Sequence, residues 1–470
     1  MPTSPPPTTA KSYSLDALLT RAFAMPERLY LDRRCCRRGF QTCPGEAKRA
    51  SRDAIGIVLV QRQTSHAEYA DRGRSETCFA RPTNRRSVLS DELRPSNHAP
   101  GGRDCHRLRG DLNCVRSTWT LPVHPPSPSG SARPLMPIDV HAHYVPHRVI
   151  ATLEERAKDF GLSLVKTPPQ CAIHFDYGLK IRPFFQKLIE PVNERLGAMA
   201  AQGVTCQVLS VWPDIFAYGL PSATAASWHR LLNESLAQLC RQHPDEFALF
   251  ASVPLPDAAA AAREAEFAVK ELGAAGLVVA SNEEGVNLGE LALDELWDAA
   301  VKLDAPVFIH PVQAMPTPRI AKFALAQIAQ YTFDTTLCVG SLIFSGVLDR
   351  FPDLRIILAH GGGTFPYLIG RFDCMHARMD RAAQGDVAAL SPSAYVRRFH
   401  YDTILHSAMH LRWLAEAVGV ERMLLGSDYS FPPADLDPVG TVRKAGFSDV
   451  ETAKILDYNA RELMPRLTNK

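Results

Sequence analysis

Short apolar runs alternate with longer amphipathic stretches along this chain from Met136 onward. Eight of these runs have the length and composition of β-strands. They cover residues 137–143, 204–211, 247–253, 275–280, 305–311, 354–360, 400–405 and 423–428. The alternation predicts strands joined by helices, which is the pattern of an α/β fold.

Two of the intervening stretches show clear helical patterns. One begins at Ser222, a residue type that favours the N-cap, and its apolar side chains share one stripe: Trp228, Leu231, Leu232, Leu236 and Leu239. The other, 257–272, is rich in Ala and Glu, and Gly273 after it suits a helix C-cap. Eight strands alternating with helices over about 330 residues predict a distorted (β/α)8 TIM barrel. An open doubly wound sheet is the alternative, but no glycine-rich phosphate turn follows the first strand.

Two segments fall outside this alternation. Residues 144–189 are too long for a plain loop, so we expect a small insertion over the barrel mouth, within a barrel domain that spans 136–470. Residues 1–135 are rich in Arg, Ser and Pro with little periodicity, which predicts a basic, disordered extension. A nucleic-acid arm or a targeting presequence is disfavoured, because the arginines lack interleaved aromatic residues and acidic residues interrupt them. Met136 directly precedes the first strand, so a natural product starting there, with 1–135 an artefact of the gene model, stays open.

Charge and composition narrow the function classes. The net charge of the 470 residues is only +2, and residues 1–135 carry 22 Lys and Arg against 12 Asp and Glu, so the remainder is mildly acidic. A nucleic-acid-binding function for the whole protein therefore does not follow. No apolar run approaches the roughly 18–20 residues of a membrane helix, and the first residues lack a secretory signal. The 11 cysteines lack zinc-finger spacing and suit free thiols in a reducing compartment. We expect a cytoplasmic protein that binds no membrane.

Polar residues that can bind a metal or transfer a proton end four of the predicted strands. The first strand ends in His141 and His143, which share one face because alternate residues of a strand point the same way. The other three end in His310, His360 and Asp428. Barrel enzymes carry their sites at the carboxyl ends of the strands. These side chains are therefore expected to converge on one rim, although a single buried histidine is usually a core residue.

Three histidines and one carboxylate suit a borderline divalent ion such as zinc, with one position left for water. We assign His141, His143, His310 and Asp428 as the metal ligands. His360 is expected just outside them, where an imidazole with a pKa near neutrality can exchange a proton with substrate or metal-bound water. A fifth ligand or a structural hydrogen bond is the alternative role for His360.

Arg182 and Arg371 are candidates for binding a substrate carboxylate, because a guanidinium can hold a carboxylate with two hydrogen bonds. Arg182 lies in the predicted insertion, and Arg371 follows the histidine of the sixth strand by eleven residues. Taken alone, an arginine in either position is more often a surface salt-bridge residue. No spacing separates them from Arg195 or Arg319.

Five motifs give residues 136–465 a family resemblance. This part of the chain resembles the amidohydrolase superfamily, in particular its non-hydrolytic decarboxylases, typified by 2-amino-3-carboxymuconate 6-semialdehyde decarboxylase. The motifs are IDVHAH (138–143), IRPFFQ (181–186), FIHP (308–311), LAHGGGTFPYLIGR (358–371) and LLGSDYSFP (424–432). The last two are far more specific than the His-x-His pair, and the resemblance covers none of residues 1–135.

The resemblance implies the same four ligands around one zinc per subunit, or around another divalent ion such as Mn2+. The residue matching His360 is implied as the general acid/base, and Asp428 belongs to the catalytic group as well as to the ligands. Residues matching Arg182 and Arg371 are implied to hold substrate carboxylate, the latter reaching in from the partner subunit of a homodimer.

The implied reaction is non-oxidative loss of CO2 from an unsaturated or aromatic acid, such as aminocarboxymuconate semialdehyde or 6-methylsalicylate. One departure bears on the substrate: Val312 stands where the muconate semialdehyde decarboxylase has a tryptophan. A zinc-dependent hydrolase of a lactone or amide is the first rival, since the ligands alone do not separate it, although two carboxylate-binding arginines favour decarboxylation. A degenerate barrel acting as a binding or scaffold protein is the second, and the intact metal-site positions argue against it.

Overall fold

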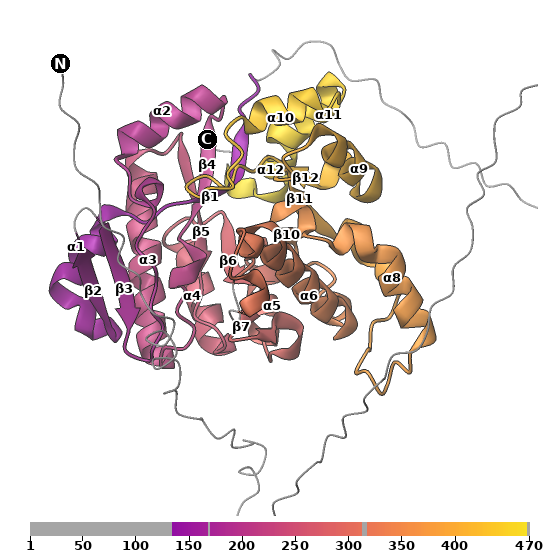
Figure 1. Ribbon diagram of the computed structural model, residues 1–470, viewed down its shortest axis with the longest axis horizontal. Coiled ribbons are helices and arrows are strands. Elements are labelled where there is room, and N and C mark those ends of the chain that lie inside the picture. Colours follow the sequence, from indigo (N-terminus) through magenta and orange to yellow (C-terminus); the bar gives the residue numbers. More distant parts are fainter. Residues whose placement is uncertain (1–133, 168–169, 313–316, 468–470) are drawn as a thin grey trace, which may run out of the picture. The chain divides into compact units, whose positions relative to one another are not determined.

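The eight predicted strands form the centre of the molecule. The computed structural model describes residues 134–167, 170–312 and 317–467. Its strands pair in parallel in the order β1 (Ile138–His143), β4 (Cys206–Ser210), β5 (Phe247–Ser252), β6 (Gly276–Ala280), β9 (Val307–His310), β10 (Ile356–Leu358), β11 (Phe399–Asp402) and β12 (Met423–Leu424). Hydrogen bonds from Val140 N to Leu425 O and from Asp428 N to His141 O join the first strand to the last segment. The predicted (β/α)8 barrel is confirmed, and most strands are shorter than predicted (Figure 1).

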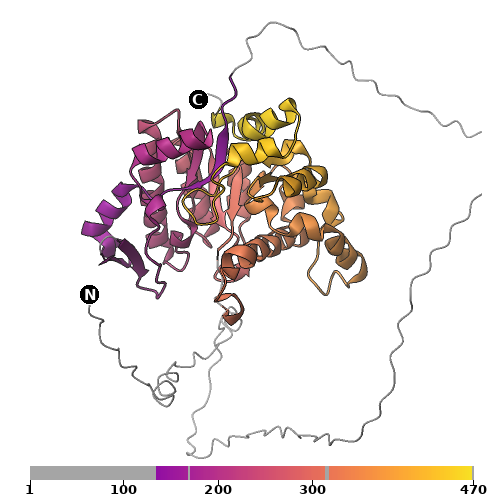
Figure 2. The same cartoon turned by 45° about the horizontal axis from the view of Figure 1, so that its top comes forward.

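Helices surround these strands in both views (Figure 1, Figure 2). They are α2 (Val192–Gln202), α3 (Ser222–Gln242), α4 (Ala258–Lys270), α5 (Asp294–Lys302), α6 (Tyr331–Phe344), α7 (Val347–Arg350), α8 (Phe365–Arg378), α9 (Ala408–Val418), α10 (Pro438–Lys444), α11 (Asp449–Ala453) and α12 (Asn459–Leu463). The predicted apolar stripe of α3 is buried throughout. Two predicted helix ends are wrong by one or two residues: Pro221, not Ser222, caps α3, and Glu271 caps the end of α4, with Gly273 in the following turn. Caps depend on which backbone groups find partners, which apolar spacing does not encode.

The predicted insertion after the first strand is confirmed. It contains α1 (His147–Arg156) and an antiparallel hairpin of β2 (Leu162–Thr167) and β3 (Gln170–Phe175), drawn in purple beside α3 (Figure 1). A second hairpin, β7 (Asn282–Glu283) and β8 (Val286–Asn287), follows β6. Segments of both, together with loops that follow the strands, line a cavity of about 730 Å³. The mouth of the barrel is therefore walled by additions to the regular fold.

The prediction of a disordered extension over residues 1–135 falls on residues outside the described part, apart from the last two. Across the described ranges, no helix has both the length and the apolar character needed to cross a bilayer. The core consists of the strands and the inward faces of the helices, with Trp212, Trp228 and Trp297 fully buried. The barrel thus provides a rigid frame for the side chains at its ends.

Candidate metal centre

The four predicted ligands come together at the carboxyl ends of the strands. His141 and His143 lie at the end of β1, His310 is the last residue of β9, and Asp428 lies in the segment after β12. One ligand atom from each residue lies within 4.8 Å of the others, and all four residues are buried. Parallel strands bring their carboxyl ends to one rim, so residues distant in sequence meet there. The structure therefore contains a buried metal site of three histidines and one aspartate.

Each imidazole is oriented by a partner at its Nδ1 atom. Nδ1 of His141 lies 2.7 Å from Oδ2 of Asp402, and Nδ1 of His143 lies 3.0 Å from Oγ of Ser210. Nδ1 of His310 lies 2.8 Å from the carbonyl oxygen of the next residue, while its buried Nε2 has no hydrogen-bond partner among the described residues. With the Nδ1 protons engaged, the three Nε2 atoms are available as metal ligands. An unpartnered, buried Nε2 beside a carboxylate fits a metal ion.

The electrostatics of the cluster favour a positive charge at its centre. Oδ1 of Asp428 lies 3.2 Å from Nε2 of His141 and 3.4 Å from Nε2 of His143. Burial lowers the pKa of His143 to about 4 and holds the pKa of His310 well below its usual range. Burial also opposes a charge on His141, but the carboxylates of Asp428 and Asp402 raise its pKa to about 10. A divalent cation meets the same demand while all three imidazoles stay neutral.

His360 lies beside the four ligands without joining them. It follows β10, and its Nε2 lies 3.5 Å from Oδ2 of Asp428. Its side chain is 15% exposed, more than that of any of the four ligands. Both His360 (φ 55) and Asp428 (φ 56) have left-handed backbones, which non-glycine residues rarely adopt. Two residues with this unfavourable backbone are thus neighbours at the rim.

The glycines after His360 pack against the protein itself. At Gly363 (φ 65), a Cβ atom would lie 2.1 Å from the carbonyl oxygen of Thr332, so only glycine allows this contact. The glycine run therefore seats the segment beneath His360 against its neighbours.

Sequence reasoning missed Asp402, the residue behind two of the histidines. Its carboxylate accepts hydrogen bonds from Nδ1 of His141 and from the backbone N–H groups of His360 and Gly361, each at 2.7–2.8 Å. Burial opposes its charge, but the hydrogen bond and charge of His141 hold its pKa below the usual range. Asp402 is the last residue of β11, so its position at a strand end was the signal that could have found it.

Arg182 and Arg195, which the sequence did not separate, have different environments. The fully buried Arg195 donates hydrogen bonds to the carbonyl oxygen of His143 and to Ser430, so it braces the rim from behind. Arg182 lines the mouth cavity and donates to Asp214 over 3.3 Å. Its guanidinium also lies over the rings of two buried or half-buried aromatic residues, Phe185 and Trp212, at 4.8 and 5.4 Å.

The remaining two arginines do not reach this site within the chain. Arg371 lies on α8 with an exposed side chain and does not line the mouth cavity. Arg319 is exposed on a short 3-10 turn. The structure therefore brings Arg182 to the cavity beside the rim and leaves Arg371 on the outer surface.

Comparisons with known proteins agree on one family. The model of the Amidohydro_2 (amidohydrolase) family matches residues 138–466. A 2-amino-3-carboxymuconate-6-semialdehyde decarboxylase of Dictyostelium discoideum is 32% identical over 278 residues, which is 59% of this chain and 77% of the relative. A 6-methylsalicylic acid decarboxylase of Penicillium expansum is 30% identical over 341 residues, covering 70% and 96%. The crystal structure of 5-carboxyvanillate decarboxylase from Sphingomonas paucimobilis matches with a TM-score of 0.60 and 25% identity, covering 70% and 99%.

Proposed function

This chain belongs to the amidohydrolase family, and from that premise we propose that it is a metal-dependent, non-oxidative decarboxylase of an unsaturated or aromatic carboxylic acid. The observation that carries the proposal is the buried set of three histidines and one aspartate, with a further, more accessible histidine beside it. Relatives named as decarboxylases of a carboxymuconate semialdehyde and of 6-methylsalicylic acid support this reaction type.

We assign zinc to the site, held by His141, His143, His310 and Asp428. Three imidazole nitrogens and one carboxylate oxygen suit this borderline ion, with Mn2+ as the alternative. The bound cation would supply positive charge that offsets the negative charge developing on substrate oxygens. Metal analysis of the purified protein, followed by reconstitution with each ion, tests the assignment. One equivalent of zinc per chain is expected.

His360 is proposed to move the proton. Its imidazolium donates a proton from Nε2 to the carbon that carries the carboxylate. The bond from this carbon to the carboxylate then breaks, its electron pair restores the unsaturated system, and CO2 leaves. Water returns the proton to the imidazole, so one proton replaces one CO2. The 3.5 Å separation from Asp428 and the partial exposure of His360 support this role.

The mouth cavity is proposed to hold the substrate. Its volume of about 730 Å³ is in the range of small-molecule sites, and aromatic side chains such as Phe216 and Tyr331 line it. Arg182 is proposed to bind the substrate carboxylate, for which it would exchange its hydrogen bond to Asp214. Val312, where the muconate semialdehyde decarboxylase has tryptophan, leaves room for a larger ring or an additional substituent.

Arg371 is proposed to complete the site of a second copy in a homodimer. Apolar side chains are exposed near it on α8 and α9: Tyr367 is 77%, Met409 70% and Trp413 40% exposed, and the rings of Tyr367 and Trp413 lie 6.1 Å apart. Clustered apolar exposure of this kind marks protein contacts. Arg371→Ala and His360→Ala proteins should each be inactive alone. After random exchange of equal amounts of the two subunits, half of the dimers are hybrids and each has one complete site of two, so the mixture should recover about a quarter of wild-type activity.

The deciding experiment measures CO2 from a panel of acids with zinc-loaded protein. The panel contains aminocarboxymuconate semialdehyde, 6-methylsalicylate and 2,6-dihydroxybenzoate, and chelated protein serves as the control. One acid should lose one CO2 for each molecule consumed. Hydrolysis of lactone or amide probes with no CO2 from any acid would replace the proposal with the hydrolase alternative.

A further inference from the structure

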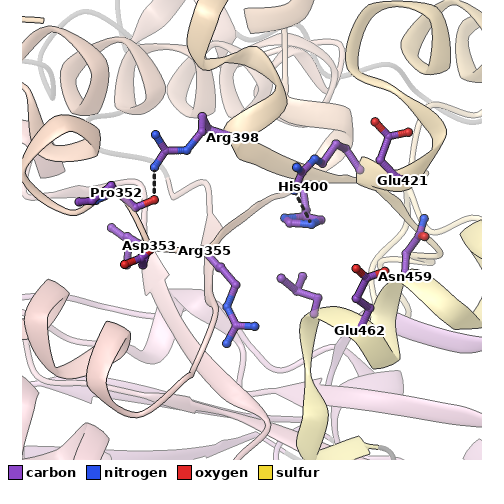
Figure 3. Close-up of a pocket in the computed structure, with 11 residues that line it drawn as sticks. Pro352, Asp353, Arg355, Arg398, His400, Glu421, Asn459 and Glu462 are labelled. Carbon is purple, nitrogen blue, oxygen red and sulfur yellow. Dashed lines mark hydrogen bonds between the residues drawn. The ribbon is translucent and has the colours of Figure 1, made fainter. Parts of the chain in front are cut away.

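A second cavity, of about 390 Å³, lies at the opposite end of the barrel (Figure 3). An arginine stands directly before each of three neighbouring strands and lines it: Arg355 before β10, Arg398 before β11 and Arg422 before β12. Because parallel strands begin at one end and finish at the other, this cavity lies on the face opposite the metal site. It shares no residue with the mouth cavity.

Two of the three arginines have no acidic partner in the described part of the chain. Arg355 forms an ion pair with Asp304 outside the cavity. Arg398 donates to a backbone carbonyl oxygen, and Arg422 donates to Nε2 of His400 over 3.3 Å. Within the described ranges neither Arg398 nor Arg422 forms an ion pair, and the buried Nε of Arg422 has no hydrogen-bond partner. Two guanidinium groups at this cavity therefore lack an anion.

The histidine between them contributes no positive charge. His400 is 7% exposed and accepts the hydrogen bond from Arg422 at Nε2. Burial, followed by the charges of Arg422 and Arg355, lowers the pKa of His400 to about 3. The imidazole is therefore neutral at physiological pH and acts as an acceptor that orients Arg422.

Acidic side chains line the same cavity as the arginines. Figure 3 shows Arg355, Arg398 and Asp353 on one side, and Glu421 and Glu462 on the other. Neither glutamate forms an ion pair with any residue that the structure describes. With Asp353, the three acidic groups balance the three arginines, so a simple anion such as phosphate would gain little net attraction. A molecule carrying both charges can contact both kinds of side chain.

We propose that this cavity binds a small zwitterion, namely an α-amino acid with an apolar side chain. Its carboxylate lies between Arg398 and Arg422, and its ammonium group faces Glu421. Leu354 and Leu463 supply the apolar part of the lining for the side chain. Opposite charges at fixed separation recognise a zwitterion better than an ion of either sign, since each charge gains a partner that the free protein lacks.

Calorimetric titration of the full-length, metal-loaded protein with L-leucine tests the proposal. The analogues 4-methylpentanoate, which lacks the amine, and 3-methylbutylamine, which lacks the carboxylate, are titrated in parallel. Leucine should bind, and each analogue should bind at least about tenfold more weakly, because one charged contact is lost. Equal binding of either analogue, or binding of inorganic phosphate in preference to leucine, would overturn the proposal.

Variants assign the binding to this cavity. Arg398→Gln and Glu421→Gln should each weaken leucine binding about tenfold, whereas Arg397→Gln, an exposed neighbour outside the cavity, should not. Melting curves check that each variant is folded, and Glu462→Gln replaces any variant that is not. Unchanged affinity in both an arginine and a glutamate variant would show that leucine binds elsewhere, and the proposal would fail.

Discussion

The two ends of this barrel both gather charged side chains around histidines, yet they balance charge in opposite ways. At the carboxyl rim, three imidazoles surround one carboxylate, and their ligand atoms lie within 4.8 Å of one another in a fully buried cluster. At the amino end, three arginines and three carboxylates line one cavity. The metal site therefore requires a bound cation. In the second cavity the charges of the lining side chains cancel, so it suits a ligand with no net charge.

The two ends of the barrel also differ in backbone conformation. His360 and Asp428 at the rim have positive φ angles, whereas no residue that lines the second cavity has one. Such conformations cost of order 1–3 kcal/mol each and persist only where the surroundings impose them. The metal site is therefore built at a cost in stability, whereas the residues of the second cavity have ordinary backbone conformations.

The largest effect is expected when the metal site loses its carboxylate. Asp428→Ala removes the one carboxylate among the four ligands, so bound metal should fall to about a tenth or less and turnover to background. Metal analysis and CO2 release measure both. Asp437→Ala, an exposed aspartate at the start of α10, is the matched control. Full metal content in Asp428→Ala would mean that the cluster is not the metal site.

The next largest effect separates metal binding from proton transfer at the rim. His360→Ala should keep its metal, because His360 is not among the four ligands, but turnover should fall by about 10²–10⁴. His376→Ala on α8 controls for loss of a partly buried histidine that pairs with an aspartate. Near-normal rates in His360→Ala would remove His360 from the proton transfer.

A smaller effect is expected from the residue behind the ligands. Asp402→Asn keeps the side-chain size but holds the ring of His141 less firmly, so metal affinity should fall about 10- to 100-fold. Competition with a chelator of known affinity measures the change. Unaltered affinity would show that the 2.7 Å contact is incidental to metal binding.

The smallest effect concerns the neutral histidine at the base. Its pKa of about 3 lies below the usual 6.5, so between these values the unfolded chain binds a proton that the folded protein excludes. Stability therefore falls as the pH falls, by about 1.4 kcal/mol per pH unit from this residue. His400→Gln retains an acceptor for Arg422 but cannot be protonated, so the loss between about pH 6.5 and 5 should shrink by about 2 kcal/mol. Denaturant unfolding at several pH values measures this, and an identical pH slope in both proteins would contradict the assignment of a neutral His400.

The fold was predictable because the strands lie in largely apolar runs and helices such as α3 carry an apolar stripe. What the pattern could not give is where strands stop. The run 423–428 forms a strand of only two residues. The residues after Leu424 are joined to β1 by separate hydrogen bonds, such as that from Asp428 N to His141 O, rather than by a regular ladder. Strand ends depend on such cross-barrel partners, which local apolar spacing does not record.

The site was predictable as far as strand-end logic reaches. His310 and Asp428 were found because parallel strands share a rim, and the structure brings them together. Asp402 was missed, and Arg195 was not distinguished from the other candidate arginines, because their roles arise from contacts with residues 261 and 52 positions away. The role of Arg371 stays a prediction, since it depends on a second copy of the chain.

Strand β11 connects the two ends within four residues. It begins at Phe399, directly after Arg398, and its second residue, His400, accepts a hydrogen bond from Arg422. It finishes at Asp402, which holds both the ligand His141 and the segment of His360. A ligand in the second cavity that shifts this strand would change the affinity of the metal site for its cation. By thermodynamic reciprocity, the cation would then change the affinity of the second cavity for that ligand by the same factor. Because β11 has only four residues, binding at the second cavity is expected to be coupled to binding at the metal site.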